Sequence, residues 1–308
     1  MDLRQLRTFV HVAELGSLSK AADRLRIAQP ALSRQVRMLE DELKVPLFSR
    51  HGRGMVLTSS GEVLLARAVA VLRDLEAARA DVAAEQGTVR GRVVLGAPPT
   101  VGDALSARLV ERFLNLHPDV FIRIVSAFSG YLLDWLQRGE IDLAVVYEPE
   151  VRQNLRIEPL FAETLFLVGG PDAMPSRKRQ VPFAKVLERR LVLPGPQHGL
   201  RKIVERAAQK VDRTLDIVVE ADSLQTMKDL VERGTGWTIL PLGSVHREIS
   251  QGRLTAAQIT APQLTRTLVI AEALGRQTSR AARLFHETLR AEVHDMVKNR
   301  IWNGTLLK

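Results

Sequence analysis

Residues 28–36 read Ala-Gln-Pro-Ala-Leu-Ser-Arg-Gln-Val, and this stretch decides how the rest of the chain is interpreted. Continued as a helix to residue 43, it has two faces. An apolar stripe at spacings of three and four is formed by Leu32, Val36, Leu39 and Leu43. The other face carries Gln29, Ser33 and Arg37, with Pro30, Arg34 and Gln35 beside them. Apart from the proline, these side chains can contact base edges and phosphates, so the helix suits the DNA major groove.

The preceding segment predicts two more short helices. The first carries an apolar stripe of Leu3, Leu6, Phe9, Val10 and Ala13. It should end at Gly16, which tolerates the left-handed conformation of a helix C-cap, and Ser17 can cap a second helix that runs to Leu25. Pro30 is accepted in a first helical turn because its missing N–H would be unpaired there. Two short helices, a tight turn and a polar-faced helix form the helix-turn-helix pattern.

Residues 46–58 predict a β-hairpin wing, because two short apolar runs flank a basic, glycine-rich tip. Arg50, His51 and Arg53 at this tip could reach the phosphate backbone or a narrow minor groove. Residues 1–58 contain 10 Lys and Arg against 6 Asp and Glu, which is +4 of the chain's +9. We expect Gln29, Ser33 and Arg34 nearest the bases, with Pro30 placing the first turn and Arg37 on a phosphate. A phosphate contact by Arg34 is the alternative.

The chain resembles the LysR-type transcriptional regulators over residues 3–9, 16–22, 28–39, 47–50 and 57–61. The resemblance implies an α-rich N-terminal winged helix-turn-helix, a dimerising linker helix and an effector domain of two α/β lobes, of the periplasmic-binding-protein type. It also implies dimers of dimers, contact with RNA polymerase, and activation of target genes with self-repression. Residues 97–100 and 198–201 resemble more weakly a subgroup that includes nitrogen-assimilation regulators.

Composition sets the outer bounds. The chain has 308 residues, 45% of them apolar and 26% charged, which fits two or three soluble globular domains. No run approaches the roughly 20 apolar residues of a membrane span, and no signal peptide is evident, so a cytoplasmic location is expected. With no cysteine there is no disulfide, thiol nucleophile or cysteine metal site. A pI near 10.3 suits a polyanion partner such as double-stranded DNA.

A long helix is predicted from Ser59 to about Glu85, because Ser59 and Glu62 have the spacing of a capping box. Its apolar residues alternate spacings of four and three, which is typical of a coiled-coil seam: Leu64, Ala68, Val71, Leu75, Ala78 and Val82. The seam either joins two DNA-binding heads and sets their half-site spacing, or packs on its own chain. Residues 86–91 are then a hinge.

Beyond residue 91 the pattern alternates strands and helices, which favours two α/β units with mostly parallel sheets. Strands are expected near 92–96, 121–125, 141–146, 165–168, 190–193, 215–219, 237–240 and 268–270, and helices near 103–116, 130–138, 199–209 and 223–233. The predicted domains are 1–58 for the head, 59–90 for linker and hinge, and 91–308 for the effector domain. Lobe I would hold about 91–164 and 268–308, and lobe II about 165–267.

Ligands of such sheets bind at the carboxyl ends of strands, near helix N-termini. This rule selects Thr100, Ser129, Gln197 and His198 as effector contacts, and hydroxyls with free N–H groups there suit a small anion. For each hydroxyl, simple helix capping is the alternative, and His198 could equally be an exposed loop histidine.

Two rival functions stay open at this stage. An enzyme is disfavoured because the chain has no nucleophile elbow, phosphate-binding loop or dinucleotide fingerprint, and its seven histidines lack metal-ligand spacing. No cofactor or metal is expected. A regulator that works without an effector remains the second rival. Trp135, Trp237 and Trp302 are expected to be packing residues, and residues 301–308 are either disordered or docked on a neighbouring element.

Overall fold

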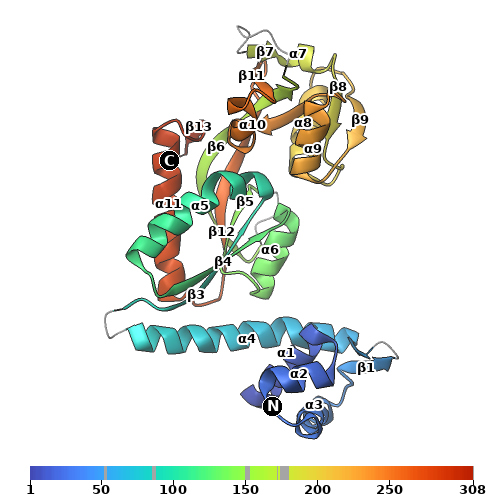
Figure 1. The fold of residues 1–308 in the computed structure, drawn as a ribbon, viewed down its shortest axis with the longest axis vertical. Coiled ribbons are helices and arrows are strands. Elements are labelled where there is room, and N and C mark those ends of the chain that lie inside the picture. Colours follow the sequence, from blue (N-terminus) through green and yellow to red (C-terminus); the bar gives the residue numbers. More distant parts are fainter. Residues whose placement is uncertain (52–53, 85–87, 150–152, 172, 174–179, 308) are drawn as a thin grey trace.

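A computed structural model describes residues 1–308 except 52–53, 85–87, 150–152, 172, 174–179 and 308. Three parts follow one another along the long axis (Figure 1). A small N-terminal head lies at one end, a long helix crosses the molecule beside it, and two α/β lobes extend away from that helix.

The head contains α1 (Leu3–Leu15), α2 (Leu18–Leu25), α3 (Gln29–Leu43) and a hairpin of β1 (Phe48–His51) and β2 (Gly54–Leu57). The predicted caps are confirmed: Gly16 is left-handed at φ 59°, and Ser17 Oγ accepts a hydrogen bond from Lys20 N at 3.4 Å. The core of the head includes Phe9, Leu32 and Leu39, all fully buried. The hairpin is tied to the α1–α2 turn by a hydrogen bond from Met55 N to Gly16 O at 2.9 Å.

The linker helix α4 (Ser59–Ala84) begins directly on the head. The predicted cap is one residue off: Thr58, not Ser59, caps the helix, with its Oγ1 accepting from Gly61 N at 3.0 Å. Gly61 then packs so closely that a Cβ there would lie 2.2 Å from the Leu47 carbonyl oxygen. The start of α4 is therefore part of the head rather than a flexible tether.

Three faces of α4 meet three different surroundings. One face packs on the head core through Leu64, Leu65, Ala68, Val69 and Leu72. A second, which includes Arg73, Ala77 and Ala80, faces lobe I. The predicted seam is thus divided: Ala68 is buried in the head, whereas Val71 and Val82 are 47% and 73% exposed. The exposed third face continues through Ala78.

Lobe I is built on β3 (Gly91–Ala97), β4 (Val120–Ser126) and β5 (Leu143–Tyr147). Its helices are α5 (Pro99–Leu116), α6 (Ser129–Arg138) and α11 (Arg280–Lys298), and a short strand β13 (Gly304–Leu306) joins it near the C-terminus. One core includes Phe113 and Phe285 of α5 and α11, and a second is formed around Leu132 and Leu136 of α6. The sheet is therefore covered on both faces.

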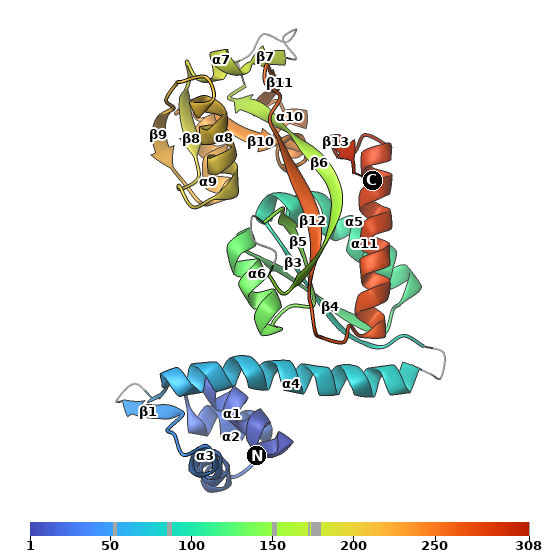
Figure 2. The same cartoon turned by 180° about the vertical axis from the view of Figure 1, so that it is seen from behind.

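Two long strands, β6 (Leu155–Gly169) and β12 (Thr265–Ala273), run through both lobes (Figure 2). They pair antiparallel with each other in one sheet of order β4-β3-β5-β12-β6-β11-β7, to which β10 and β13 add by pairing with β6. Lobe II adds β7 (Gln180–Pro182), α7 (Phe183–Val186), β8 (Arg190–Leu193), α8 (Gly199–Gln209), β9 (Asp216–Glu220), α9 (Leu224–Glu232), β10 (Thr238–Pro241), a 3-10 turn (Leu242–Ser244), α10 (His246–Ser250) and β11 (Thr255–Thr260).

All eight predicted strands and four predicted helices of this domain are found, with boundaries shifted by a few residues except at β6, which begins at Leu155, ten residues before the predicted strand at 165–168. The expectation of mostly parallel sheets is wrong at the centre, because every pairing of β6 is antiparallel. The sequence did not predict the helices α7, α10 and α11, the 3-10 turn, or the strands β7, β11 and β13. Trp302 is confirmed as a packing residue, 1% exposed and edge-on to Phe161. Among the described residues, no helix is sufficiently long and apolar to cross a membrane.

A histidine between two carboxylates joins α11 to the long strands. His286 Nδ1 lies 3.0 Å from Glu272 Oε1, and its Nε2 lies 2.9 Å from Glu158 Oε2. The hydrogen bond to Glu272 raises the pKa of His286. A raised folded-state pKa gives stability that is fully present below the unfolded pKa of about 6.5 and is lost as pH rises through the folded value.

We therefore expect His286→Gln to remove part of the fall in unfolding free energy that occurs as the pH rises above about 6.5. Urea unfolding at a series of pH values measures this slope. The same replacement at the exposed His246 is the matched control for the loss of an imidazole. An unaltered slope in His286→Gln would contradict the assignment.

Candidate DNA-binding helix and effector site

The helix α3 presents the polar face that the sequence predicts. Gln29, Pro30, Arg34 and Arg37 are exposed and Ser33 is half-buried, while Leu32, Val36 and Leu39 are buried beneath them. Its N-cap residue, Ala28, supplies no side-chain hydrogen bond, so N–H groups of the first turn remain available to a phosphate. Gln35 differs from its neighbours: its Oε1 accepts a hydrogen bond from Thr8 Oγ1, which anchors α3 to α1.

The structure describes the wing on either side of its tip. The backbone of Arg50 and His51 belongs to β1, adjacent to the tip of the hairpin. The side chains of these two residues, and the whole of Arg53, lie outside the described residues.

Polar side chains from separate strand ends meet where the two lobes face each other. Thr100 Oγ1 is hydrogen bonded to the Tyr147 hydroxyl and accepts from Arg266 Nη2 at 3.2 Å. The Arg266 guanidinium lies 3.8 Å from the centroid of the Tyr147 ring. Ser129 Oγ accepts from Tyr147 N at 3.3 Å. We call Thr100, Ser129, Tyr147 and Arg266, with His198, the inter-lobe cluster.

Lobe II reaches this cluster through His198. Its ring lies edge-on to Phe128 with 4.8 Å between ring centroids, which brings the start of α8 against the start of α6. Its Nδ1 accepts from Leu200 N at 3.1 Å and caps α8. Burial and then the charge of Arg266 lower the pKa of His198 to about 4. The imidazole is therefore neutral near pH 7, with Nδ1 occupied and Nε2 left as the donor.

A buried ion pair supports the cluster from behind. Arg266 Nε donates to Glu163 Oε2 at 2.6 Å, and these side chains are 2% and 1% exposed. The other Glu163 oxygen, Oε1, accepts from Trp302 Nε1 at 2.6 Å. Arg266 lies on β12 and Glu163 on β6, so the pair joins the two strands that both lobes share.

Three of the residues selected by the strand-end rule, Thr100, Ser129 and His198, lie at the starts of α5, α6 and α8 and belong to the inter-lobe cluster. Gln197 is exposed and makes none of the contacts of the cluster described above. Sequence reasoning missed Tyr147, Arg266 and Glu163. Tyr147 ends the strand β5 and was available to the same rule, whereas no local pattern marks Arg266 or Glu163. Within the described part of the chain, no group of three or more His, Asp or Glu side chains could hold a metal ion.

A winged head on a long helix and a two-lobe α/β domain together define a DNA-binding regulator with a ligand-binding module. Two family models match the chain: "LysR substrate binding domain" over residues 86–294 and "Bacterial regulatory helix-turn-helix protein, lysR family" over residues 3–62. The chain therefore belongs to the LysR family of transcriptional regulators and is a regulator rather than an enzyme.

Among its relatives is the nitrogen assimilation regulatory protein nac of Klebsiella aerogenes, 34% identical over 269 residues that cover 87% of each chain. The HTH-type transcriptional regulator BbuR of Bordetella bronchiseptica is 29% identical and covers 99% of this chain and 94% of its own. Among solved structures, full-length OxyR from Pseudomonas aeruginosa superposes with a TM-score of 0.75 at 28% identity, covering 96% of this chain and 95% of its own. CbnR in complex with its target DNA shares the fold, with a TM-score of 0.71 at 20% identity over 95% and 100% of the chains.

Proposed function

We propose that α3 reads a specific operator sequence in the major groove, with Gln29, Ser33 and Arg34 on base edges and Arg37 on a phosphate. The observation that carries this is the exposed polar face of α3 on a fully packed head. Pro30 places the first turn, and Arg50, His51 and Arg53 position the wing on the backbone or the minor groove. The solved complex of CbnR with its target DNA supports use of the shared fold on DNA.

We also propose that the exposed face of α4 pairs two chains, with Val71, Leu75, Ala78 and Val82 in the contact. Leu64 and Ala68 are withdrawn from that proposal because they pack on the head of their own chain. We infer that such pairs assemble into a cytoplasmic tetramer that contacts RNA polymerase. The proposed domains are 1–58, 59–90 and 91–308, with the first turns of α4 packed on the head. A symmetric dimer presents two heads to two half-sites.

The inter-lobe cluster is our candidate effector site, and a small anion is the proposed effector class. Three helix N-termini and the Arg266 guanidinium meet there, and both favour negative charge. Because Arg266 already pairs with Glu163, its guanidinium is not an isolated cation. An effector anion must therefore compete with Glu163 for the N–H donors of Arg266. A thermal-shift screen of small carboxylates and phosphates against the full chain tests this, and Thr100→Val should abolish any shift that is found. A screen with no stabilising anion would favour the effector-independent alternative.

The experiment for the DNA proposal is a footprint on the DNA upstream of the protein's own gene, with wild type and Arg34→Ala at fixed salt and excess nonspecific DNA. We expect a discrete footprint over two or more helical turns, weakened about 10-fold in the variant, which is the loss of one base contact. Arg290→Ala, an exposed arginine on α11, is the matched control. A wild-type footprint unchanged by Arg34→Ala would exclude this residue as a reader.

A further inference from the structure

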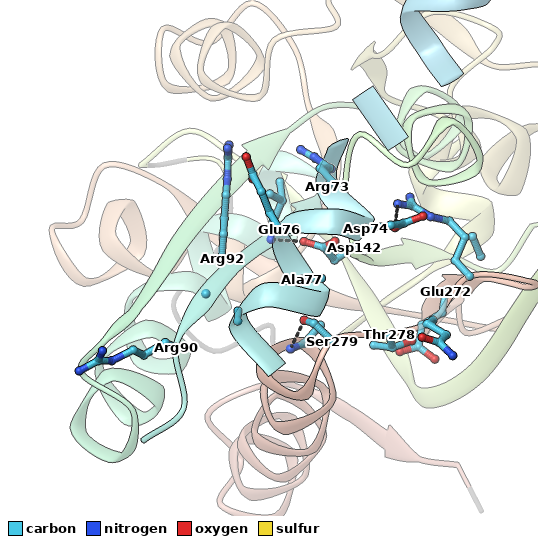
Figure 3. Close-up of a pocket in the computed structure, with 17 residues that line it drawn as sticks. Arg73, Asp74, Glu76, Ala77, Arg90, Arg92, Asp142, Glu272, Thr278 and Ser279 are labelled. Carbon is cyan, nitrogen blue, oxygen red and sulfur yellow. Dashed lines mark hydrogen bonds and ion pairs between the residues drawn. The ribbon is translucent and has the colours of Figure 1, made fainter. Parts of the chain in front are cut away.

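The linker helix lies against the edge of lobe I that is farthest from lobe II (Figures 1 and 2). Figure 3 shows this contact, which surrounds a cavity of about 170 Å³. The side chains around it come from α4, from the start of β3 and from the turn between β12 and α11. Small residues of α4, Ala77 and Ala80, allow the close approach, and Ala80 Cβ would lie 3.2 Å from a Cβ built on Gly91.

Among the described residues, three hydrogen bonds join α4 to lobe I across this boundary. Arg73 Nη1 donates to the Gly139 carbonyl oxygen at 2.6 Å. Arg276 Nη2 donates to Asp74 Oδ1 at 2.7 Å, and the backbone N–H of Arg280 donates to Asp81 Oδ1 at 3.0 Å. We call these three contacts the linker latch.

Each contact uses a favourable electrostatic arrangement. Asp81 places a carboxylate at the N-terminus of α11, a helix of 19 residues, where its dipole and free N–H groups favour negative charge. Gly139 is the C-cap of α6, so the Arg73 cation meets the negative end of that helix. Burial lowers the pKa of Arg73, and the nearby carboxylate of Asp142 opposes that shift, so the partly buried guanidinium relies on its acceptors for the solvation that it has lost.

Two rigid elements connect the latch to the inter-lobe cluster. The helix α6 begins at Ser129, in the cluster, and is capped by Gly139, in the latch, about 15 Å away along its axis. The strand β12 carries Arg266 in the cluster and ends at Ala273, three residues before Arg276 in the latch. A displacement of either element at the cluster therefore moves a partner of α4.

We propose that the linker latch transmits the state of the inter-lobe cluster to α4, and so sets the orientation of the DNA-binding head relative to lobe I. The inference rests on the proposed function, because it makes the latch the regulatory output of the effector site. An effector that favours one lobe arrangement shifts α6 and β12, and the latch converts that shift into one of two head orientations.

The absence of cysteine allows a direct test on the full chain. Asp23→Cys in the head and Leu116→Cys in lobe I provide two exposed positions for spin labels. Mixing with excess unlabelled protein makes labelled pairs between different subunits rare, so the measured distances lie within one chain. Double electron–electron resonance then measures the distance between the head and lobe I in this doubly labelled protein, which is the parent of the variants below. No ligand or DNA is needed for this readout.

Arg276→Ala and Asp81→Ala should each give a longer and broader distance distribution than the parent. Asp74→Arg should do the same, and adding Arg276→Asp to it should restore the parental distribution. Arg253→Ala is the matched control, since it removes an arginine–carboxylate pair of the same 2.7 Å length within lobe II. Identical distributions in the parent and in Arg276→Ala would overturn the latch.

Transmission is tested by Thr100→Val, which removes the hydroxyl shared by Tyr147 and Arg266. We expect it to shift the distance distribution, and to have no further effect in the Arg276→Ala background, because the two changes act through one pathway. If Arg276→Ala changes the distance distribution but Thr100→Val does not, the latch holds α4 on lobe I without transmitting the state of the inter-lobe cluster, and the proposed transmission is disproved. A missing operator footprint would refute the proposed function alone, since the distance readout is independent of DNA.

Discussion

Val71→Asp is expected to weaken operator binding by about 100-fold or more. Val71 lies on the exposed face of α4, 47% exposed in the single chain, and we propose that this face pairs two subunits. When two α4 helices pair, a carboxylate at position 71 is buried without a partner. The free-energy cost of burying that charge exceeds the stabilisation that the apolar Val71 contact provides. Once the pair separates, each head binds its half-site alone and loses the gain of about 100-fold to 10,000-fold that linked binding provides.

Analytical ultracentrifugation measures the separation of subunits, and fluorescence anisotropy on the footprinted operator measures affinity. Val63→Asp is the control, because Val63 is 67% exposed on the same helix but lies off the stripe of Val71, Ala78 and Val82. It introduces the same charge and should change neither quantity appreciably. If Val71→Asp remains oligomeric with wild-type affinity, α4 does not form the subunit contact.

Glu163→Ala is expected to lower the free energy of unfolding by about 3–5 kcal/mol. The substitution leaves Arg266 buried with no carboxylate, and it also removes the acceptor of Trp302 Nε1. An uncompensated buried charge is costly because the protein interior solvates it poorly. The lost indole acceptor adds to that cost, since a buried donor without a partner is itself unfavourable.

Urea unfolding followed by tryptophan fluorescence measures the effect, and Trp302 reports it locally. Glu232→Ala is the control, since Glu232 also pairs with an arginine but is 30% exposed, and an exposed pair contributes about 1 kcal/mol or less. Equal losses in the two variants would show that burial of the Glu163–Arg266 pair has no special weight.

The local patterns of the sequence predicted most elements, because helix periodicity, caps and strand composition are properties of neighbouring residues. Pro30 and Gly16 mark the turns of the head without reference to any tertiary contact. The central strand β6 shows where this reasoning stops. Its second half was predicted as a short strand, but its full course from Leu155 to Gly169 depends on pairing with β12, whose partners lie about a hundred residues away in sequence.

The candidate effector site was predictable only where its residues follow strands. Thr100 and Ser129 were found in this way because parallel strands deliver their carboxyl ends to one edge. Arg266 was missed because it lies inside a strand, and its burial is tolerated only through Glu163, 103 positions earlier. The division of the α4 seam was hidden for a similar reason: identical apolar spacing serves both the head core at Ala68 and the exposed face at Val71.

The path of the chain through the lobes has a consequence for biosynthesis. The core of lobe I joins residues of β3, where the chain enters the lobe, to residues of α11 and to Trp302. All of lobe II lies between these segments in the sequence and is synthesised before α11. During synthesis the head and the strands of lobe II therefore emerge from the ribosome before α11 can cover the sheet of lobe I. Nascent chains that stop before α11 would carry a DNA-reading helix on a linker whose Asp81 has no helix terminus to meet. Such products would bind DNA without control by the lobes, so loss of the last helix should act as a dominant defect in cells that also make the intact protein.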